Sequence, residues 1–462
     1  MNLLIKNTRF LDLDSDLGFR ENQDIVVQAN RIKSIKPTGD NIEGIEILDG
    51  SNLFITPGFI NAHTHSTENL LRGSSEKIPL EKWLFKQFNE APIFTPELTY
   101  LSALLGVMEM LKSGTTAVMD HLWITPSINC EILDSVMSAY AFSGMRASVA
   151  PMLEDQDLFT IHSRSSSDGS KIITDHQKSS LPFEKIFDYV EQFIEKWHKT
   201  HNDRLRCLPG PGGLQWCSEK LLNRSLQLSD QYNTGLHMHL NETRLQAEIC
   251  SSYYGRSAVS QLQKLGILNQ STSLAHAVWV DDEDIEILAK ACVSVVHNPI
   301  SNLKLASGIA PIIKMLNSRM NIALGADGAA SNDNQDMFSV MKITGLIHNP
   351  AILKSKDWIS SKEVLCMATS GGSKVLGHKD GLGKIQEGYL ADLVFHDYKY
   401  FLNKIINDPL QMLVYSTTGS SIKHVMVDGN WLIKDNSYIR FDEEEILHEI
   451  NIHLNNLLDK AQ

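Results

Sequence analysis

Residues 59–65 read FINAHTH, an apolar run that passes directly into two histidines. Successive side chains of a β-strand point to opposite faces, so His63 and His65, which are two positions apart, point to the same face. Two converging imidazoles suit a borderline metal ion such as Zn²⁺ or Fe²⁺. Because histidines at this spacing often meet by chance or through packing, the interpretation depends on what the rest of the chain supplies.

Seven further apolar runs follow, and most of them also end in a group that can take part in chemistry. The eight strand candidates, each with the residue at its end, are 59–62 at His63, 117–119 at Asp120, 147–150 at Pro151, 205–208 at Pro209, 234–236 at His237, 272–275 at His276, 292–296 at His297 and 321–325 at Asp327. Active sites of (β/α)₈ barrels lie at the C-terminal ends of the strands, whereas a doubly wound sheet gathers its site at one switch point. Six of the eight runs end in His or Asp. The pattern therefore predicts an α/β fold with a (β/α)₈ TIM-type barrel.

The segments around these strands support this organisation. Residues 95–97, Thr-Pro-Glu, are typical of a helix start, and apolar residues then recur on one helical face until Gly114. Both chain ends are instead rich in short extended runs, such as 24–28 and 424–429. Residues 442–458 carry an apolar residue at every fourth position from Ile446 onward, which predicts a C-terminal helix.

The composition of this 462-residue chain excludes several classes of function. Its 42 Lys and Arg against 55 Asp and Glu give a formal charge of −13, whereas binding to nucleic-acid phosphates needs a basic surface. The N-terminus lacks the apolar core of a signal peptide, and no apolar run approaches the ~18 residues of a membrane span. The six cysteines form no CxxC pair, so we expect a reduced, cytoplasmic enzyme. The polar stretch 154–180 is long for a βα connection and predicts a lid or a mobile excursion.

Further groups at the strand ends complete a candidate metal site. Asp327 can supply an anionic oxygen, and the fifth strand ends in two candidate ligands, His237 and His239, which spacing alone does not distinguish. Glu242 favours His239, because three residues beyond this histidine a carboxylate can lie beside the water on the metal without being a ligand. His276 at the tip of the sixth strand is a further candidate. The fourth strand ends without a lysine that could bridge a second ion, so we expect one metal.

Six ordered parts of the chain are similar to those of a known family. They are PGFINAHTH with the following LLRG (57–65 and 70–73), HLNET (239–243), LAH (274–276), HNPISNLKL (297–305), GADGAAS (325–331) and GYLADLV (388–394). Together they resemble the amidohydrolase superfamily. The branch they resemble contains metal-dependent deaminases and chlorohydrolases, among them S-adenosylhomocysteine/methylthioadenosine deaminases, triazine hydrolases and 8-oxoguanine-type deaminases. The resemblance covers nearly the whole chain.

The resemblance implies a set of site residues, and all of them are present. The implied metal ligands are His63, His65, His239 and Asp327, and the implied catalytic residues are Glu242, His276 and Asp327. The implied metal is one divalent ion per chain, with zinc expected and iron as the alternative. For the fold, the resemblance implies a barrel over residues 57–375, one small β-sandwich from residues 1–56 and 376–438 together, and a C-terminal helix over 439–462.

The groups available to take and give protons favour hydrolytic deamination of an amino-substituted purine, pterin, pyrimidine or triazine. The metal makes hydroxide available at neutral pH, Asp327 can take a proton from the water, and Glu242 can carry a proton to the leaving amine. Chloride leaves without a proton, so a triazine-type hydrolase that removes chloride or an alkylamine is the alternative. A non-catalytic binding protein on the same fold is an alternative of another class, but it predicts missing ligands.

Four residues are candidates for contact with the substrate. Adenosine-type members of the family carry a histidine after the fourth strand, where residues 209–218 read PGPGGLQWCS without one, which weakens the case for a nucleoside. Gln215 and Trp216 can instead offer an amide and a stacking face. Trp83 can wall the pocket, and His121 can reach it from a strand tip. As partners we expect a small heterocyclic substrate and further copies of the chain in a homodimer or higher homo-oligomer, without nucleic acid or membrane.

Overall fold

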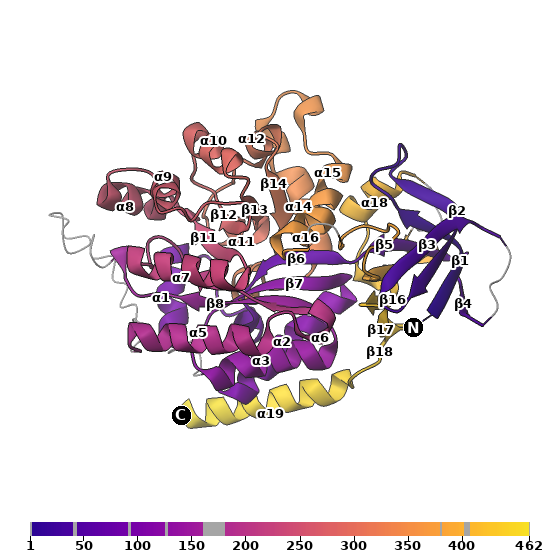
Figure 1. Ribbon diagram of the computed structural model, residues 1–462, viewed down its shortest axis with the longest axis horizontal. Coiled ribbons are helices and arrows are strands. Elements are labelled where there is room, and N and C mark those ends of the chain that lie inside the picture. The colour runs from indigo at the N-terminus through magenta and orange to yellow at the C-terminus, as the bar shows by residue number, and fades with distance from the viewer. Residues whose placement is uncertain are drawn as a thin grey trace.

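The computed structural model describes residues 2–39, 44–90, 94–124, 128–159, 181–378, 381–401 and 407–461. Its centre is a barrel of parallel strands ringed by helices, and a separate, largely antiparallel sheet lies at one side (Figure 1). No helix in these ranges has the length and apolar character that a membrane crossing requires. Most of the predicted lid, residues 160–180, lies outside the described residues.

The barrel consists of two parallel sheets that meet at both edges. One contains β6 (Phe59–Thr64), β7 (Thr115–Leu122), β8 (Arg146–Leu153), β9 (Leu205–Cys207) and β10 (Gly210–Pro211), and the other contains β11 (Leu236–Leu240), β12 (Thr272–His276), β13 (Ser294–His297) and β14 (Asn321–Leu324). At one edge the His239 N–H donates to the Gly212 carbonyl at 3.3 Å, and at the other the Asp327 N–H donates to the His63 carbonyl at 2.9 Å. All eight predicted strands are present, and the predicted barrel is confirmed.

Helix α2 (Pro96–Lys112) shows how the sequence builds the outer ring. Thr95 caps the helix, because its side chain accepts a hydrogen bond from the Leu98 N–H at 3.2 Å. Gly114 follows with a φ of +79°, a conformation that favours glycine and ends the helix. The other helices of the ring include α3 (Cys130–Ser143), α5 (Phe183–Trp197), α7 (Glu219–Tyr232), α8 (Arg244–Tyr254), α9 (Ala258–Lys264), α10 (Asp282–Lys290), α11 (Pro299–Lys304), α12 (Ile312–Asn317), α14 (Met337–Ile347), α15 (Ser361–Cys366) and α16 (Gly372–Val375).

Both chain ends join in one nine-stranded sheet, shown at the right of Figure 1. Its main path runs β18 (Ser437–Tyr438), β17 (Asn430–Lys434), β16 (Ile422–Val427), β15 (Leu393–Asp397), β5 (Leu53–Pro57), β1 (Asn2–Leu11), β2 (Phe19–Gln28) and β3 (Arg31–Pro37), and β4 (Glu46–Asp49) pairs with β1. Strand β15 from the C-terminal part runs antiparallel to β5 from the N-terminal part. A small β-rich unit made from both ends is therefore confirmed, in the form of this single sheet.

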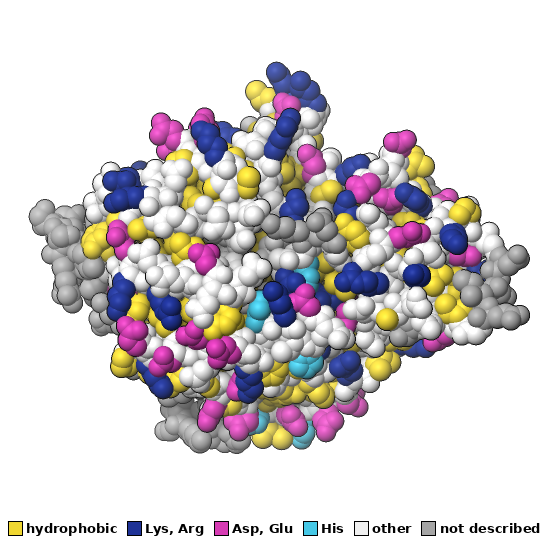
Figure 2. Space-filling view, in the orientation of Figure 1, with side chains coloured by type: hydrophobic (Ala, Val, Ile, Leu, Met, Phe, Trp, Pro, Cys, Tyr) yellow, Lys and Arg dark blue, Asp and Glu magenta, His cyan; other side chains and the backbone are white. Residues whose placement is uncertain are grey.

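A buried ion cluster joins the barrel to the sheet. Arg146, at the start of β8, donates from Nε and Nη2 to the two carboxylate oxygens of Asp392 at 2.8 and 3.0 Å. A second carboxylate, that of Asp428, lies 3.5 Å from Nη2. Helix α19 (Glu443–Ala461), predicted from its apolar spacing, runs along α2 on the outside of the barrel. On the face in Figure 2, basic and acidic side chains are interspersed.

Candidate active site

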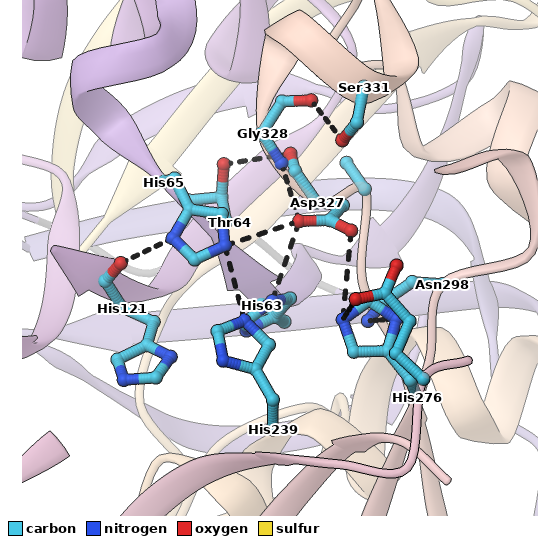
Figure 3. Close-up of polar contacts among 12 residues, drawn as sticks. His63, Thr64, His65, His121, His239, His276, Asn298, Asp327, Gly328 and Ser331 are labelled. Carbon is cyan, nitrogen blue, oxygen red and sulfur yellow. Dashed lines mark hydrogen bonds and ion pairs between the residues drawn. The ribbon is translucent and has the colours of Figure 1, made fainter. Parts of the chain in front are cut away.

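Four side chains from three barrel strands converge at the C-terminal end of the barrel (Figure 3). Oδ1 of Asp327, which follows β14, lies 3.5 Å from Nε2 of His63 and 3.4 Å from Nε2 of His65. Nε2 of His239, on β11, lies 3.4 Å from Nε2 of His65. All four residues are nine-tenths or more buried. The structure thus brings the four predicted metal ligands to one point.

The hydrogen bonds behind these imidazoles fit a metal ion at that point. Nδ1 of His65 lies 2.5 Å from the His121 carbonyl oxygen, and Nδ1 of His239 lies 2.6 Å from the Gly212 carbonyl oxygen. Because a carbonyl only accepts, each Nδ1 carries the proton and each Nε2 offers a lone pair. Nε2 of His63 is buried and has no hydrogen-bond partner in the described part of the chain. Three imidazole nitrogens and one carboxylate are a donor set for a divalent ion such as Zn²⁺.

The charge states of these groups also suit a metal. Burial lowers the pKa of His63 to about 4, although the Asp327 carboxylate opposes this shift. Burial and the neighbouring imidazoles hold the pKa of His239 well below its ordinary value. Burial alone would raise the pKa of Asp327, but the neighbouring His63, His276 and His65 keep it well below the usual range. At neutral pH the imidazoles of His63 and His239 are therefore neutral and the Asp327 carboxylate is charged, as ligation of a metal requires.

His237 lies behind His63 rather than at the point of convergence. Its Nε2 is 2.8 Å from Nδ1 of His63, and its Nδ1 is 2.7 Å from Oγ of Ser273. Of the two histidines that spacing left open, the structure therefore brings only His239 to His65 and Asp327. His237 is placed to hold the ring of His63.

Glu242 and His276 lie beside the metal ligands. Nε2 of His276 is 3.7 Å from Oε2 of Glu242 and 3.8 Å from Oδ2 of Asp327. Nδ1 of His276 lies 2.9 Å from Oδ1 of Asn302, which fixes the ring. His276 and Asp327 have φ values of +71° and +67°, strained conformations of the kind that cluster at functional sites.

Burial raises the pKa of Glu242 to about 7. Nearby His276 opposes this rise, and the charge of Asp327 adds to it. A carboxyl group with this pKa can both give and take a proton at neutral pH, so it suits an acid–base role.

A pocket opens beside these groups and is lined largely by aromatic and apolar side chains. Its lining, apart from the groups above, consists of Leu80, Trp83, Leu84, Trp123, Met152, Trp216 and Leu305 with the polar residues Glu68, Gln87, Glu154 and Ser331. No Lys or Arg is among the described residues of this lining. Flat apolar walls with a few polar groups suit a heterocyclic ring.

The four residues predicted to contact substrate take different places. Trp83 and Trp216 line the pocket. His121 lies beside the metal ligands, with its ring centroid 4.7 Å from that of His239 and its Nε2 3.1 Å from the Gly210 carbonyl oxygen. Gln215 is buried, and its side-chain amide lies within 3 Å of where a Cβ at position 213 would be. Contact of any of the four with substrate stays a prediction.

Of this pocket lining only Trp83 and Trp216 were predicted from the sequence, and Trp123, Glu154 and Glu68 are among the residues that were not. Trp123 and Glu154 follow the ends of β7 and β8, and Glu68 lies three positions after His65 in the short helix η1 (Ser66–Leu71). Their position just beyond a barrel strand was a signal for all three, because the segments after the strands form the mouth of the barrel.

Comparisons with known proteins agree with this geometry. The model of the amidohydrolase family matches residues 54–432. A 5-methylthioadenosine/S-adenosylhomocysteine deaminase of Syntrophomonas wolfei is 34% identical over 457 residues, which are 97% of each chain. A 5'-deoxyadenosine deaminase of Methanosarcina acetivorans is 32% identical over 467 residues, which are 100% of this chain and 99% of the relative.

Two solved structures share the fold over nearly their whole length. An adenosine deaminase from Xanthomonas campestris with bound zinc superimposes with a TM-score of 0.87 at 25% identity, and 99% of each chain is covered. An atrazine chlorohydrolase from Arthrobacter aurescens complexed with zinc gives a TM-score of 0.87 at 24% identity, with 97% of this chain and 99% of that chain covered.

Proposed function

The chain belongs to the amidohydrolase family, and we propose on this premise that it deaminates adenine nucleosides whose 5' substituent carries no charge. It is a metal-dependent hydrolase that acts on C–N bonds of amino-substituted nitrogen heterocycles. The narrower substrate class is supported by the relatives, which are named for 5'-deoxyadenosine, methylthioadenosine and S-adenosylhomocysteine.

The pocket supports a choice among these three compounds. S-adenosylhomocysteine ends in an amino acid that carries both an ammonium and a carboxylate, whereas 5'-deoxyadenosine and methylthioadenosine are uncharged. The described lining holds the acids Glu68 and Glu154 and no basic side chain. A carboxylate brought beside these acids would meet like charges without a partner, which is unfavourable in a desolvated site. The acidic lining therefore carries the preference for an uncharged substrate.

We assign His63, His65, His239 and Asp327 as the ligands of one divalent ion per chain, and zinc as that ion. The solved adenosine deaminase with bound zinc supports this choice. When bound, zinc lowers the pKa of water from 15.7 toward ~7 and so makes hydroxide available at neutral pH.

The acid–base groups of the chain then divide the proton transfers. Asp327 accepts the proton of the attacking water at Oδ2, the oxygen that faces His276 at 3.8 Å. His276, with its ring fixed by Asn302, orients the attacking oxygen through Nε2. Glu242, whose pKa is raised to about 7, gives a proton to the ring nitrogen next to the reacting carbon. Asp327 then passes the proton taken from water to the amino group, which leaves as ammonia, and the proton of the added hydroxyl returns to Glu242.

The leaving group separates deamination from the alternative of a triazine-type chlorohydrolase. The amino group must be protonated before it can leave as ammonia, whereas chloride leaves without a proton. A complete set of Glu242, His276 and Asp327 therefore favours deamination. The segment 209–218, which lacks the expected histidine, contributes Trp216 to the pocket, and we assign it as a stacking face for the adenine ring.

Ammonia release by zinc-loaded protein tests this proposal. We expect release from 5'-deoxyadenosine and methylthioadenosine, with kcat/KM at least about tenfold lower for S-adenosylhomocysteine, which corresponds to about 1.4 kcal/mol. Guanine, cytosine, an aminopterin and an aminotriazine serve as comparison substrates. A higher kcat/KM for S-adenosylhomocysteine, or turnover of chlorotriazines alone, would contradict the proposal.

A further inference from the structure

Glu68 is a buried acid in the pocket for which the mechanism above has no use. It is 3% exposed and lines the pocket together with Trp83 and Ser331. Its Oε2 has no hydrogen-bond partner in the described part of the chain. Leaving a carboxyl oxygen unpaired in a buried position costs free energy, which makes Oε2 a candidate acceptor for a donor that a ligand brings.

The neighbouring glycine shows that the chain makes room for this carboxyl group. A Cβ at position 328 would lie 1.9 Å from Oε2 and 2.3 Å from Cδ of Glu68. The backbone of Gly328 has a φ of −67° and a ψ of 149°, which any residue can adopt. Space for Glu68, and not backbone conformation, therefore explains a glycine next to Asp327.

Glu68 has no basic partner in the described part of the chain. No Lys or Arg pairs with Glu68 among the described residues. Burial raises its pKa to about 7, while His65 and the backbone N–H of Ala330 oppose the rise and the charges of Asp327 and Glu242 add to it. The group is thus an acid placed close to the reacting centre without an ion pair to stabilise the fold.

The barrel topology places Glu68 across the site from Glu242. Glu68 follows β6, the first strand of the barrel, and Glu242 follows β11, the fifth strand along the chain. A ring bound between the loops of these two strands meets an acid on each side. Glu242 serves the proton transfers, which leaves Glu68 to contact another part of the substrate.

We propose that Glu68 is a specificity-determining residue that accepts a hydrogen bond from an N–H or O–H group of the substrate. The proposal rests on the function proposed above. For an adenine nucleoside, the donors are the exocyclic amino group and the sugar hydroxyls, because the ring nitrogens of the base only accept. Glu68 selects substrates that present such a donor on the side of β6 and β14.

The test compares Glu68→Leu and Glu68→Gln with the wild type and with Glu76→Leu. Glu76 is an exposed acid of the same connecting segment and serves as the matched control. We measure kcat/KM for 5'-deoxyadenosine and the inhibition constants of two analogues, of which one lacks the 6-amino group and the other lacks both sugar hydroxyls. Thermal unfolding and zinc content of each variant show whether it is folded and loaded.

We expect Glu68→Leu to lower kcat/KM by about 10–100-fold, the range of a hydrogen bond to a charged group, and Glu68→Gln to lower it less. For the analogue that lacks the donor contacted by Glu68, the inhibition constants of wild type and Glu68→Leu should agree within about threefold. For the analogue that keeps this donor, the inhibition constant of Glu68→Leu should be at least about tenfold higher than that of wild type. If the insensitive analogue is the one without the amino group, the donor is that group. If it is the one without hydroxyls, the donor is the sugar.

Gly328→Ala gives an independent readout, because its Cβ must displace the Glu68 carboxyl group. We expect Gly328→Ala to weaken binding of the same analogue that Glu68→Leu weakens. The double variant should lower kcat/KM little more than either single variant does. Equal effects of Glu68→Leu on all ligands, or effects no larger than those of Glu76→Leu, overturn the proposal while the wild type remains an active deaminase. A wild type that releases ammonia from none of the amino heterocycles overturns the proposed function, and the role of Glu68 with it.

Discussion

Nδ1 of His63 lies 2.8 Å from Nε2 of His237, and this contact sets the tautomer of His63, a proposed metal ligand. The Ser273 hydroxyl donates to the Leu236 carbonyl at 3.3 Å, so its oxygen is free to accept from Nδ1 of His237 at 2.7 Å. Nε2 of His237 is then unprotonated and accepts from Nδ1 of His63. The lone pair of His63 is thereby left on Nε2, the atom that faces Asp327.

Replacing His237 and His239 one at a time should distinguish a residue that holds a metal ligand in place from a residue that binds the metal directly. We expect His237→Phe to keep zinc but to bind it about 10–100-fold more weakly, the usual effect of removing a partner behind a ligand. His239→Ala should lose stoichiometric zinc altogether. Zinc per chain, measured by atomic emission after dialysis against graded chelator, distinguishes the two. Loss of zinc from His237→Phe with retention in His239→Ala would show that the ligand assignment is wrong.

Glu242→Gln should retain zinc and lose most turnover, because the amide keeps the shape of the side chain but cannot give and take a proton. We expect a decrease in kcat of about 10²–10⁴-fold, the usual contribution of general acid–base catalysis. Rapid-quench or steady-state ammonia assays at saturating substrate measure it. An unchanged kcat would remove Glu242 from the proton transfers.

The sequence was sufficient for the barrel and for bringing the candidate metal ligands together, because the apolar strands and the polar groups at their ends recur along the chain. Each parallel strand is an apolar run with a polar group at its end, so β6, β11, β12 and β14 could be located together with His63, His239, His276 and Asp327. The choice between His237 and His239 needed Glu242 and the family resemblance. In the structure Nε2 of His239 lies 3.4 Å from Nε2 of His65, whereas Nε2 of His237 contacts Nδ1 of His63.

The pocket could not be predicted to the same extent. Trp123, Glu154 and Glu68 lie in connections, where no periodicity indicates which side chain turns inward, and their burial depends on how several loops meet over the barrel. Similarly, the room that Gly328 leaves for Glu68 joins residues 260 positions apart in the sequence. The homo-oligomer and the cytoplasmic location stay predictions of the sequence.

Stability should fall in mild acid because of His396, which is buried on β15 between Thr56 and Ser421. Burial lowers its pKa from the ordinary 6.5 to about 3. Between these values the unfolded chain binds a proton that the folded chain does not, so the free energy of unfolding decreases as the pH falls through this window. At pH 5 the decrease from this one group is about 2 kcal/mol.

Urea unfolding of the wild type and of His396→Gln at pH 7 and pH 5 measures this contribution. We expect the difference between the two pH values to be about 2 kcal/mol smaller in the variant. His448→Gln, on the exposed side of α19, is the control and should keep the wild-type difference. An equal pH dependence of His396→Gln and wild type would contradict the assignment to His396.

Removing one partner of the Arg146–Asp392 pair should lower the free energy of unfolding more than replacing both partners with apolar residues. Both side chains are 1% exposed, so Asp392→Asn leaves a buried guanidinium without its main charge partner, which costs about 3–5 kcal/mol. A double variant, Arg146→Met with Asp392→Leu, removes both charges and should recover much of this loss, because an apolar replacement avoids the desolvation of two ions. Urea unfolding of the metal-loaded protein measures the three free energies.

The exposed Arg244–Glu248 pair is the control, since Glu248→Gln should change stability by no more than about 0.5 kcal/mol. If Asp392→Asn costs no more than this control, the buried cluster does not hold the sheet to the barrel, and the apolar core at their interface must do so instead.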